Sequence, residues 1–180
     1  IIWNTYKDDV IKYADSKSEE NVMKHIVNTA ASFVDQRIKF QNFGHSNYKS
    51  REVSKAFNNL DAAKVIQVIY PCTNVEPPIL PDYKKSPRLQ FLDTGILNFD
   101  LNIQADLLLM KDLSEAYKGA IIPHIINQEV LSLNTTDYKK TNFWVRDKTQ
   151  SSAEVDLLIA HGKLLIPIRT TPGKNATLKS

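Results

Sequence analysis

The sequence predicts an α+β protein in which a mainly helical half precedes a half that ends in strands. Two observations predict this class. Apolar residues recur every three or four positions through residues 20–34 and 53–60, and β-rich runs follow one another beyond residue 141. The chain has 180 residues, of which 42% are hydrophobic and 24% charged, as in folded globular proteins. That length is enough for one large core or two small ones.

The helical half begins with a short predicted helix over residues 6–14 and a longer one over residues 20–34. Ser18 stands just before the longer helix and is expected to cap it. Five apolar residues of the longer helix share one face and are expected to be buried: Met23, Ile26, Val27, Ala30 and Val34.

A third helix is expected after the turn signal "NFGHSN", with Ser50 as its cap. Its apolar face is formed by Val53, Ala56, Phe57 and Leu60. The β-rich run from Val65 to Tyr70 follows and ends at Pro71. The order helix, turn, helix and strand predicts a winged helix-turn-helix unit.

If that unit binds DNA, the second helix of the turn motif enters the major groove with its polar side chains. The polar candidates on and beside this helix are Lys49, Arg51, Lys55, Asn58 and Asn59. The alternative is an ordinary solvated helix face, because Glu52 and Asp61 on the same helix oppose phosphate binding. The net charge of +3 permits a nucleic-acid partner without requiring one.

A proline-rich stretch divides the chain and is predicted to be extended and irregular. We take residues 76–88 as a linker between a first domain over residues 1–75 and a second over residues 89–180. Within the linker, "YKKSPR" gathers a small basic cluster beside Tyr83, formed by Lys84, Lys85 and Arg88. This cluster either meets a phosphate backbone or is a solvated loop.

The second domain reads as a short strand in "RLQFL", a helical stretch to Met110, a further helix and three strands. The further helix starts near Lys118, with Pro123 in its first turn. Its apolar stripe is formed by Ile122, Ile125, Ile126, Val130 and Leu133. The strands are "NFWVRD", "EVDLLI" and "KLLIPI", the last two joined by the turn "AHGK".

Several of these segments resemble a known family. The stretches "FLDTGILNF", "GAIIPHIINQEV", "FWVRD", "EVDLLI" and "IPI" resemble the C-terminal domain of uncharacterised function in a bacterial and archaeal family of AAA-type ATPases. The α-β-β-β order resembles the core of the PD-(D/E)xK restriction-endonuclease-like superfamily. The resemblance covers about residues 20–180. It implies that the chain is the portion of such a protein that follows the ATPase module. This portion would consist of a winged helix and then a nuclease-like domain that lacks its last helix.

The resemblance also implies site residues. In the superfamily a water on Mg²⁺ cleaves the phosphodiester, and carboxylates hold the metal. Asp156 matches the strand acid, Glu154 lies two residues away on the same strand face, and Glu129 or Glu115 is the helix acid. Asp156, Glu154 and Glu129 are thus the catalytic candidates, and Asp156 with Glu129 would hold the metal.

The third strand departs from the superfamily pattern. It reads "IPIRTT", so the expected glutamate is missing and Arg169 stands near the place of the lysine. Arginine stays protonated and cannot act as a general base, although it can contact phosphate. Pro123 also occupies the position of the first-helix glutamate. We therefore expect a degenerate site, in which Asp156 could equally pair with Arg146 or Arg169.

Other cofactors and compartments are constrained by what the sequence lacks. It contains no G-x-x-x-x-G-K-[ST] motif, so ATP could bind only to a P-loop module elsewhere in a parent protein. The four histidines have no metal-ligand spacing, and the single Cys72 cannot form an internal disulfide. With no apolar run of about 18 residues and no signal segment, we expect a cytoplasmic protein.

The sequence therefore predicts a DNA- or partner-binding module with a degenerate nuclease-like site, in which the parent's own ATPase module is one possible partner. Two alternatives stay open. One is an active Mg²⁺-dependent endonuclease, and the other is a protein-interaction or self-assembly module that never meets nucleic acid. The target and the oligomeric state are not defined by the sequence.

Overall fold

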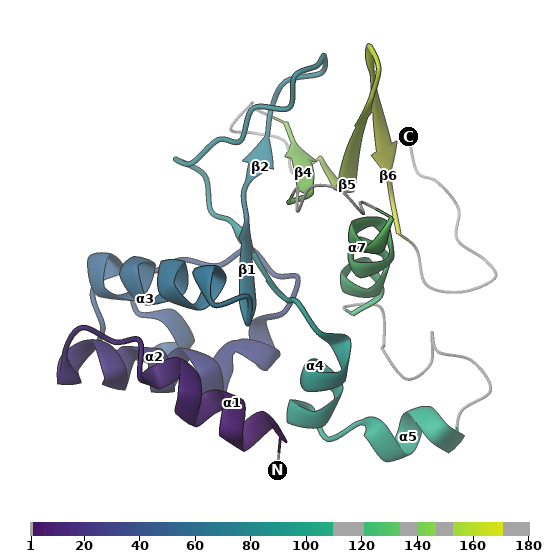
Figure 1. Ribbon diagram of the computed structural model, residues 1–180. Helices are drawn as coiled ribbons and strands as arrows, with labels where there is room; N and C mark the ends of the chain where they lie inside the picture. The colour runs from purple at the N-terminus through teal and green to yellow at the C-terminus, as the bar shows by residue number, and fades with distance from the viewer. Residues whose placement is uncertain (1, 110–120, 134–139, 147–152, 171–180) are drawn as a thin grey trace. The chain divides into compact units, whose positions relative to one another are not determined.

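The computed structural model describes residues 2–109, 121–133, 140–146 and 153–170 (Figure 1). The chain divides into two compact units that are not consecutive in sequence. Unit 1 contains Ile1–Val68 and Ser86–Asn102, and unit 2 contains Ile69–Lys85 and Ile103–Ser180. Helices and sheets occur together, which confirms the α+β class. Within the described residues, every helix is too short or too polar to cross a membrane.

Unit 1 is built on three helices, α1 (Ile2–Ile11), α2 (Lys17–Thr29) and α3 (Ser50–Ala62). The apolar spacing of α2 and α3 places their buried side chains on facing sides, and the two helices pack together. The buried residues are Val22, Met23, Ile26 and Val27 of α2, and Val53, Ala56, Phe57 and Leu60 of α3. The predicted inward face of α3 is confirmed, and so is that of α2 for Met23, Ile26 and Val27, whereas Ala30 and Val34 are buried beyond the end of α2.

The predicted helix caps are wrong by a few residues. Helix α2 is capped by Ser16, whose hydroxyl accepts a hydrogen bond of 3.2 Å from the Glu19 amide, and Ser18 lies inside the helix. Helix α3 begins at Ser50, so this residue is not the cap. Its first amides are satisfied by two side chains: Glu52 accepts from the Lys49 N–H at 2.8 Å, and Gln41 accepts from the Ser50 N–H at 3.0 Å.

The connection between α2 and α3 is longer than the tight turn we expected. It spans residues 30–49 and contains two 3-10 turns, η1 (Ala30–Phe33) and η2 (Phe43–His45). After α3, strand β1 (Ile66–Ile69) pairs with β3 (Arg88–Phe91) and not with the next strand along the chain. Helix α4 (Thr94–Asp100) then completes unit 1.

Unit 2 contains a four-stranded sheet in the order β2-β4-β5-β6. Its strands are β2 (Pro71–Cys72), β4 (Asn142–Val145), β5 (Glu154–His161) and β6 (Leu164–Ile168). Strand β2 runs parallel to β4, and the other pairs are antiparallel. The β5–β6 hairpin confirms the predicted turn, where Gly162 has a φ of 58° that glycine adopts without strain.

The described residues of unit 2 include the helices α5 (Gln104–Leu109) and α7 (Ile122–Ser132), and α7 packs against β5. The predicted isoleucine stripe of α7 is only half-buried, and Leu133 beyond it is 79% exposed. The buried residues of the helix are instead His124 and Asn127. The Asn127 amide oxygen accepts a hydrogen bond from the Thr141 hydroxyl, which gives this buried polar group a partner.

The proline-rich stretch is an ordered loop of unit 2. Its ends are joined by a bridge between Cys72 and Pro81 and by a 2.7 Å hydrogen bond from the Asp82 N–H to the Pro71 carbonyl. Asn74 organises the interior, donating to the Pro78 carbonyl at 2.7 Å and accepting from the Leu80 N–H at 3.4 Å. Of the stretch that we took as a linker, residues 76–85 form part of this loop of unit 2, and residues 86–88 belong to unit 1.

Candidate functional site

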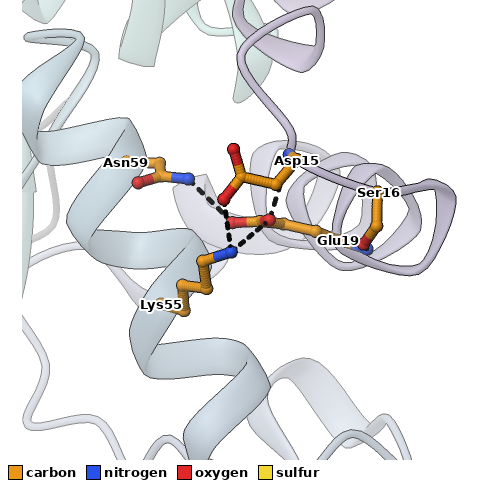
Figure 2. A network of polar contacts seen from close by, with 5 residues as sticks. All are labelled: Asp15, Ser16, Glu19, Lys55 and Asn59. Carbon is orange, nitrogen blue, oxygen red and sulfur yellow. Dashed lines mark hydrogen bonds and ion pairs between the residues drawn. The ribbon is translucent and has the colours of Figure 1, made fainter.

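Lys55, a candidate for DNA contact, is held by two carboxylates of its own chain (Figure 2). Its ammonium group donates to Asp15 Oδ2 at 2.6 Å and to Glu19 Oε2 at 2.8 Å. Asn59, one turn along α3, donates to the other Glu19 oxygen at 2.7 Å. Glu19 also accepts a 3.1 Å hydrogen bond from the Asp15 N–H. We call these four residues the Glu19 network.

The Glu19 network changes the role of Lys55. Hydrogen bonds to Asp15 and then to Glu19 raise the pKa of the Lys55 ammonium group above its ordinary value. Its positive charge is offset by two negative ones, so this part of α3 does not attract phosphate. The side-chain amide of Asn59 is likewise hydrogen-bonded to Glu19. Lys55, predicted as a DNA contact, is therefore hydrogen-bonded to acids of the same chain and links α3 to the start of α2.

The remaining candidates of α3 are placed differently. Lys49, Arg51 and Asn58 are all exposed. Glu52, the acid we expected to repel phosphate here, turns its carboxylate to the backbone N–H of Lys49. Within the described residues, no side-chain ion pair is formed by Lys49 or Arg51. These two cations therefore face solvent at the start of the helix.

The loop that leads to them has an unusual backbone. Asn42, Gly44 and His45 all lie in the left-handed region, with φ of 56°, 60° and 61°. Only glycine adopts this region without cost, so neighbouring contacts must hold the other two residues there. We call residues 41–48 the left-handed loop. The sequence predicted a turn here, but it did not predict that these residues adopt left-handed backbone angles.

The contacts that hold the left-handed loop come from α2 and from aromatic packing. His25 Nε2 donates to the Phe43 carbonyl at 3.0 Å, and Gly44 lies so close that a Cβ atom on it would be 2.8 Å from the same nitrogen. The Phe43 ring is buried between Phe33 and Phe57, with ring centroids 5.0 Å from each. The loop is therefore anchored at its centre, and His45 is exposed on it.

The basic cluster of "YKKSPR" is smaller than predicted. Arg88 is buried on β3, where its guanidinium lies 3.5 Å from the carboxylate of Asp35, and the two side chains are only 8% and 7% exposed. Gln90 donates to the same carboxylate at 3.1 Å. The assignment of Arg88 to the cluster is wrong because its charge is used inside unit 1. Lys84, which is exposed, and half-buried Lys85 remain beside Tyr83.

Asp156, the predicted metal ligand, closes the end of the β5–β6 hairpin. Its Oδ2 atom accepts two hydrogen bonds from Thr170, one from the backbone N–H at 2.8 Å and one from the hydroxyl at 3.1 Å. Arg169, the neighbouring residue, is exposed. The antiparallel pairing of Leu157 with Ile168 explains this contact. The residue before Leu157 is Asp156, and it therefore lies opposite the residues that follow Ile168.

The other predicted ligands do not complete a magnesium site. Glu129 is exposed on α7, whereas the buried side of that helix carries His124 and Asn127. Glu154 is half-buried at the start of β5, and Glu115 lies outside the described residues. The described part of the chain holds no group of three His, Cys, Asp or Glu side chains that could bind a metal ion. Among the described residues, the predicted ligands are therefore not gathered into the oxygen-rich shell that Mg²⁺ needs.

Cys72 shows no sign of reactivity. It is fully buried in the sheet of unit 2, and burial raises the pKa of its thiol. A thiolate is therefore disfavoured.

Comparison with known proteins adds one finding. A family model described as "Domain of unknown function (DUF8612)" matches residues 1–107. The chain belongs to this family. The DUF8612 match contains the Glu19 network, the left-handed loop and Tyr83, and it ends before α7 and the strands β4 to β6. No curated protein and no solved structure matches the chain.

Proposed function

We propose that the chain is a nucleic-acid-binding module without hydrolytic activity, and that unit 1 contacts duplex DNA through His45, Lys49 and Arg51. The observation that carries the proposal is the left-handed loop. A rigid loop positions its polar groups without losing further conformational entropy on binding. Strained backbone concentrates at functional sites, and here it leads directly to two exposed cations.

The electrostatics around these cations also support the proposal. Phosphate binding needs positive groups that are not already paired with acids. Lys55 does not meet this condition, because it is paired with Asp15 and Glu19. Lys49 and Arg51 do meet it, because the nearby Glu52 carboxylate is hydrogen-bonded to the backbone N–H of Lys49 and not to their side chains. The usable surface is therefore the start of α3 together with the left-handed loop, a smaller area than the whole helix face.

The absence of hydrolysis is proposed from the position of Asp156. One of its carboxylate oxygens holds the end of β6 through Thr170, and the predicted partners supply no third ligand among the described residues. The wider context, a winged helix and a degenerate nuclease-like domain in an AAA-type ATPase, rests on the sequence resemblance. In that context ATP would bind only to a separate P-loop module.

The test is fluorescence anisotropy with a short labelled DNA duplex. We expect a Lys49→Gln/Arg51→Gln variant to bind more weakly than the wild type. We also expect its log–log salt slope to be smaller by about 1.8, because each phosphate contact contributes about 0.9. The matched control is Lys12→Gln/Lys17→Gln, which removes the same charge from two exposed lysines, one just after α1 and one at the start of α2. Equal effects of the two double variants, or no duplex binding at all, would refute the proposal.

A second candidate, a protein-interaction module, is favoured by an apolar groove in unit 2. The groove has a volume of about 230 Å³, and its lining includes Trp144, Leu158, Leu165 and Pro167. Leu164 and Ile166 on the adjoining edge strand β6 are exposed. However, Pro167 has no N–H to offer another strand, which opposes edge-to-edge pairing. Light scattering over a range of concentrations tests this candidate, because self-association that Leu165→Lys, a substitution in the lining of the groove, abolishes would support it.

A further inference from the structure

Unit 2 displays an aromatic ring that its surroundings hold in place but do not cover. The side chain of Tyr83 is 73% exposed. Its ring packs against that of Tyr70, with centroids 4.7 Å apart and planes inclined by 60°. Such a tilted contact fixes one side of a ring and leaves another side open. The ring of Tyr83 is therefore both exposed and in contact with a neighbouring ring.

The turn that carries Tyr83 is fixed by Asp82. The Asp82 carboxylate accepts a 3.0 Å hydrogen bond from the Lys84 N–H, and its carbonyl accepts one of 3.2 Å from the Lys85 N–H. The Asp82 N–H in turn donates to the Pro71 carbonyl at 2.7 Å, which anchors the turn to β2. The carboxylate nearest in sequence to Tyr83 is thus engaged by the backbone, and the next residue, Lys84, is exposed.

We propose that Tyr83 and Lys84 form a binding site for single-stranded nucleic acid, in which one unpaired base stacks on the Tyr83 ring and Lys84 contacts an adjacent phosphate. Aromatic rings bind bases of any identity through their faces, and nearby cations follow the backbone. A ring that is already fixed loses little entropy when a base stacks on it. The site lies in unit 2 and uses no residue of the duplex contact proposed above, so the two proposals stand independently.

A protein partner is the other ligand that an exposed tyrosine suits. Two features favour a strand of nucleic acid. The residue that follows the ring is a cation, and the local acid is turned to the backbone, so the site offers one stacking surface and one positive charge. This pairing matches the repeating chemistry of a nucleotide, which joins a planar base to a phosphate.

The experiment measures binding of a labelled oligothymidylate to the full chain by anisotropy. We expect Tyr83→Ala to weaken binding by about 5- to 150-fold, the range that corresponds to 1–3 kcal/mol per stacked base. Tyr83→Phe keeps the ring and should bind like the wild type. Lys84→Gln should reduce the salt slope by about 0.7, the value for one phosphate of a single strand. The matched control is Tyr13→Ala, which removes a tyrosine of unit 1 that is 70% exposed.

Three outcomes would overturn the site. The first is an absence of oligothymidylate binding, and the second is equal binding by wild type and Tyr83→Ala. The third is a loss of affinity in Tyr83→Phe as large as in Tyr83→Ala, because the hydroxyl and not the ring face would then be responsible for binding. An oligomer with abasic sugars in place of thymidines should show no difference between wild type and Tyr83→Ala. The ratio of the oligothymidylate affinities of wild type and Tyr83→Ala should stay the same when both also carry Lys49→Gln/Arg51→Gln. A failure of the proposed duplex contact would therefore leave the test of Tyr83 unaffected.

Discussion

Glu19 and Lys55 form an ion pair of 2.8 Å that joins the first turn of α2 to the middle of α3. The carboxylate is almost fully buried, whereas the ammonium group is half exposed. Glu19 also accepts hydrogen bonds from the Asp15 backbone and the Asn59 side chain, so it is the central residue of the network in Figure 2. Asp15, by contrast, contacts Lys55 from an exposed position.

The first prediction follows from this asymmetry. Glu19→Ala leaves Asn59 and the Asp15 N–H without their acceptor, and it should lower the free energy of unfolding by about 1–3 kcal/mol. Asp15→Ala removes only an exposed pair and should cost at most about 1 kcal/mol. Urea denaturation of the two variants measures the difference. Equal losses would mean that Glu19 is not the central residue of the network.

The pKa of Lys55 sets the sign of a pH effect. Its pKa in the folded state lies above the ordinary value of 10.5, mainly because of the hydrogen bond to Asp15 and then that to Glu19. The stabilisation is therefore fully present below pH 10.5 and is lost as the pH rises through the folded-state pKa. The difference in stability between the wild type and Lys55→Met should be constant near neutrality and shrink in alkaline solution. A difference that grows with alkaline pH would contradict this sign.

Two glycines allow a matched test of the left-handed loop. Gly44 and Gly162 have almost the same φ, 60° and 58°, but a Cβ on Gly44 would lie 2.8 Å from His25 and 2.9 Å from Thr29, whereas Gly162 has no atom within 4 Å. Gly162→Ala should cost only the left-handed penalty of about 1–2 kcal/mol. Gly44→Ala should cost more and also weaken duplex binding. Thermal unfolding and anisotropy measure the two effects, and equal costs would mean that the close approach to α2 is unimportant.

The position of Asp156 leads to a prediction about metal. Because its Oδ2 atom is engaged by Thr170, we expect calorimetry to detect no Mg²⁺ binding that depends on Asp156. We also expect Asp156→Ala to destabilise the protein by about 1–3 kcal/mol, since the Thr170 N–H and hydroxyl lose a charged acceptor. Heat of Mg²⁺ binding that is present in the wild type and absent from the variant would restore the metal site and justify a nuclease assay.

The sequence predicted those parts of the fold that depend on local spacing. The inward faces of α2 and α3 follow from apolar residues three and four positions apart, and the β5–β6 turn follows from Gly162 between two apolar runs. These patterns need no knowledge of distant residues. The α+β class was therefore accessible from the sequence alone.

The sequence does not reveal hydrogen bonds between polar residues that are far apart along the chain. The acids that bind Lys55, a candidate for DNA contact, precede it by 36 and 40 residues. Arg88 was assigned to a basic loop because Asp35, its partner, is 53 residues away. On α7, burial of Asn127 is possible because Thr141 supplies a hydrogen bond, and hydrophobic spacing carries no information about that partner.

The buried pair of Asp35 and Arg88 provides the last prediction. Asp35 has a φ of 57°, which aspartate and asparagine tolerate better than other residues with side chains, so Asp35→Asn removes the charge with little backbone strain. The substitution leaves the Arg88 guanidinium buried without its counter-ion and should cost about 3–5 kcal/mol. Adding Arg88→Met removes that charge as well and should recover part of the loss. Urea denaturation of the single and double variants measures the coupling. If the second substitution added a full further loss, the two side chains would stabilise unit 1 independently and not as an ion pair.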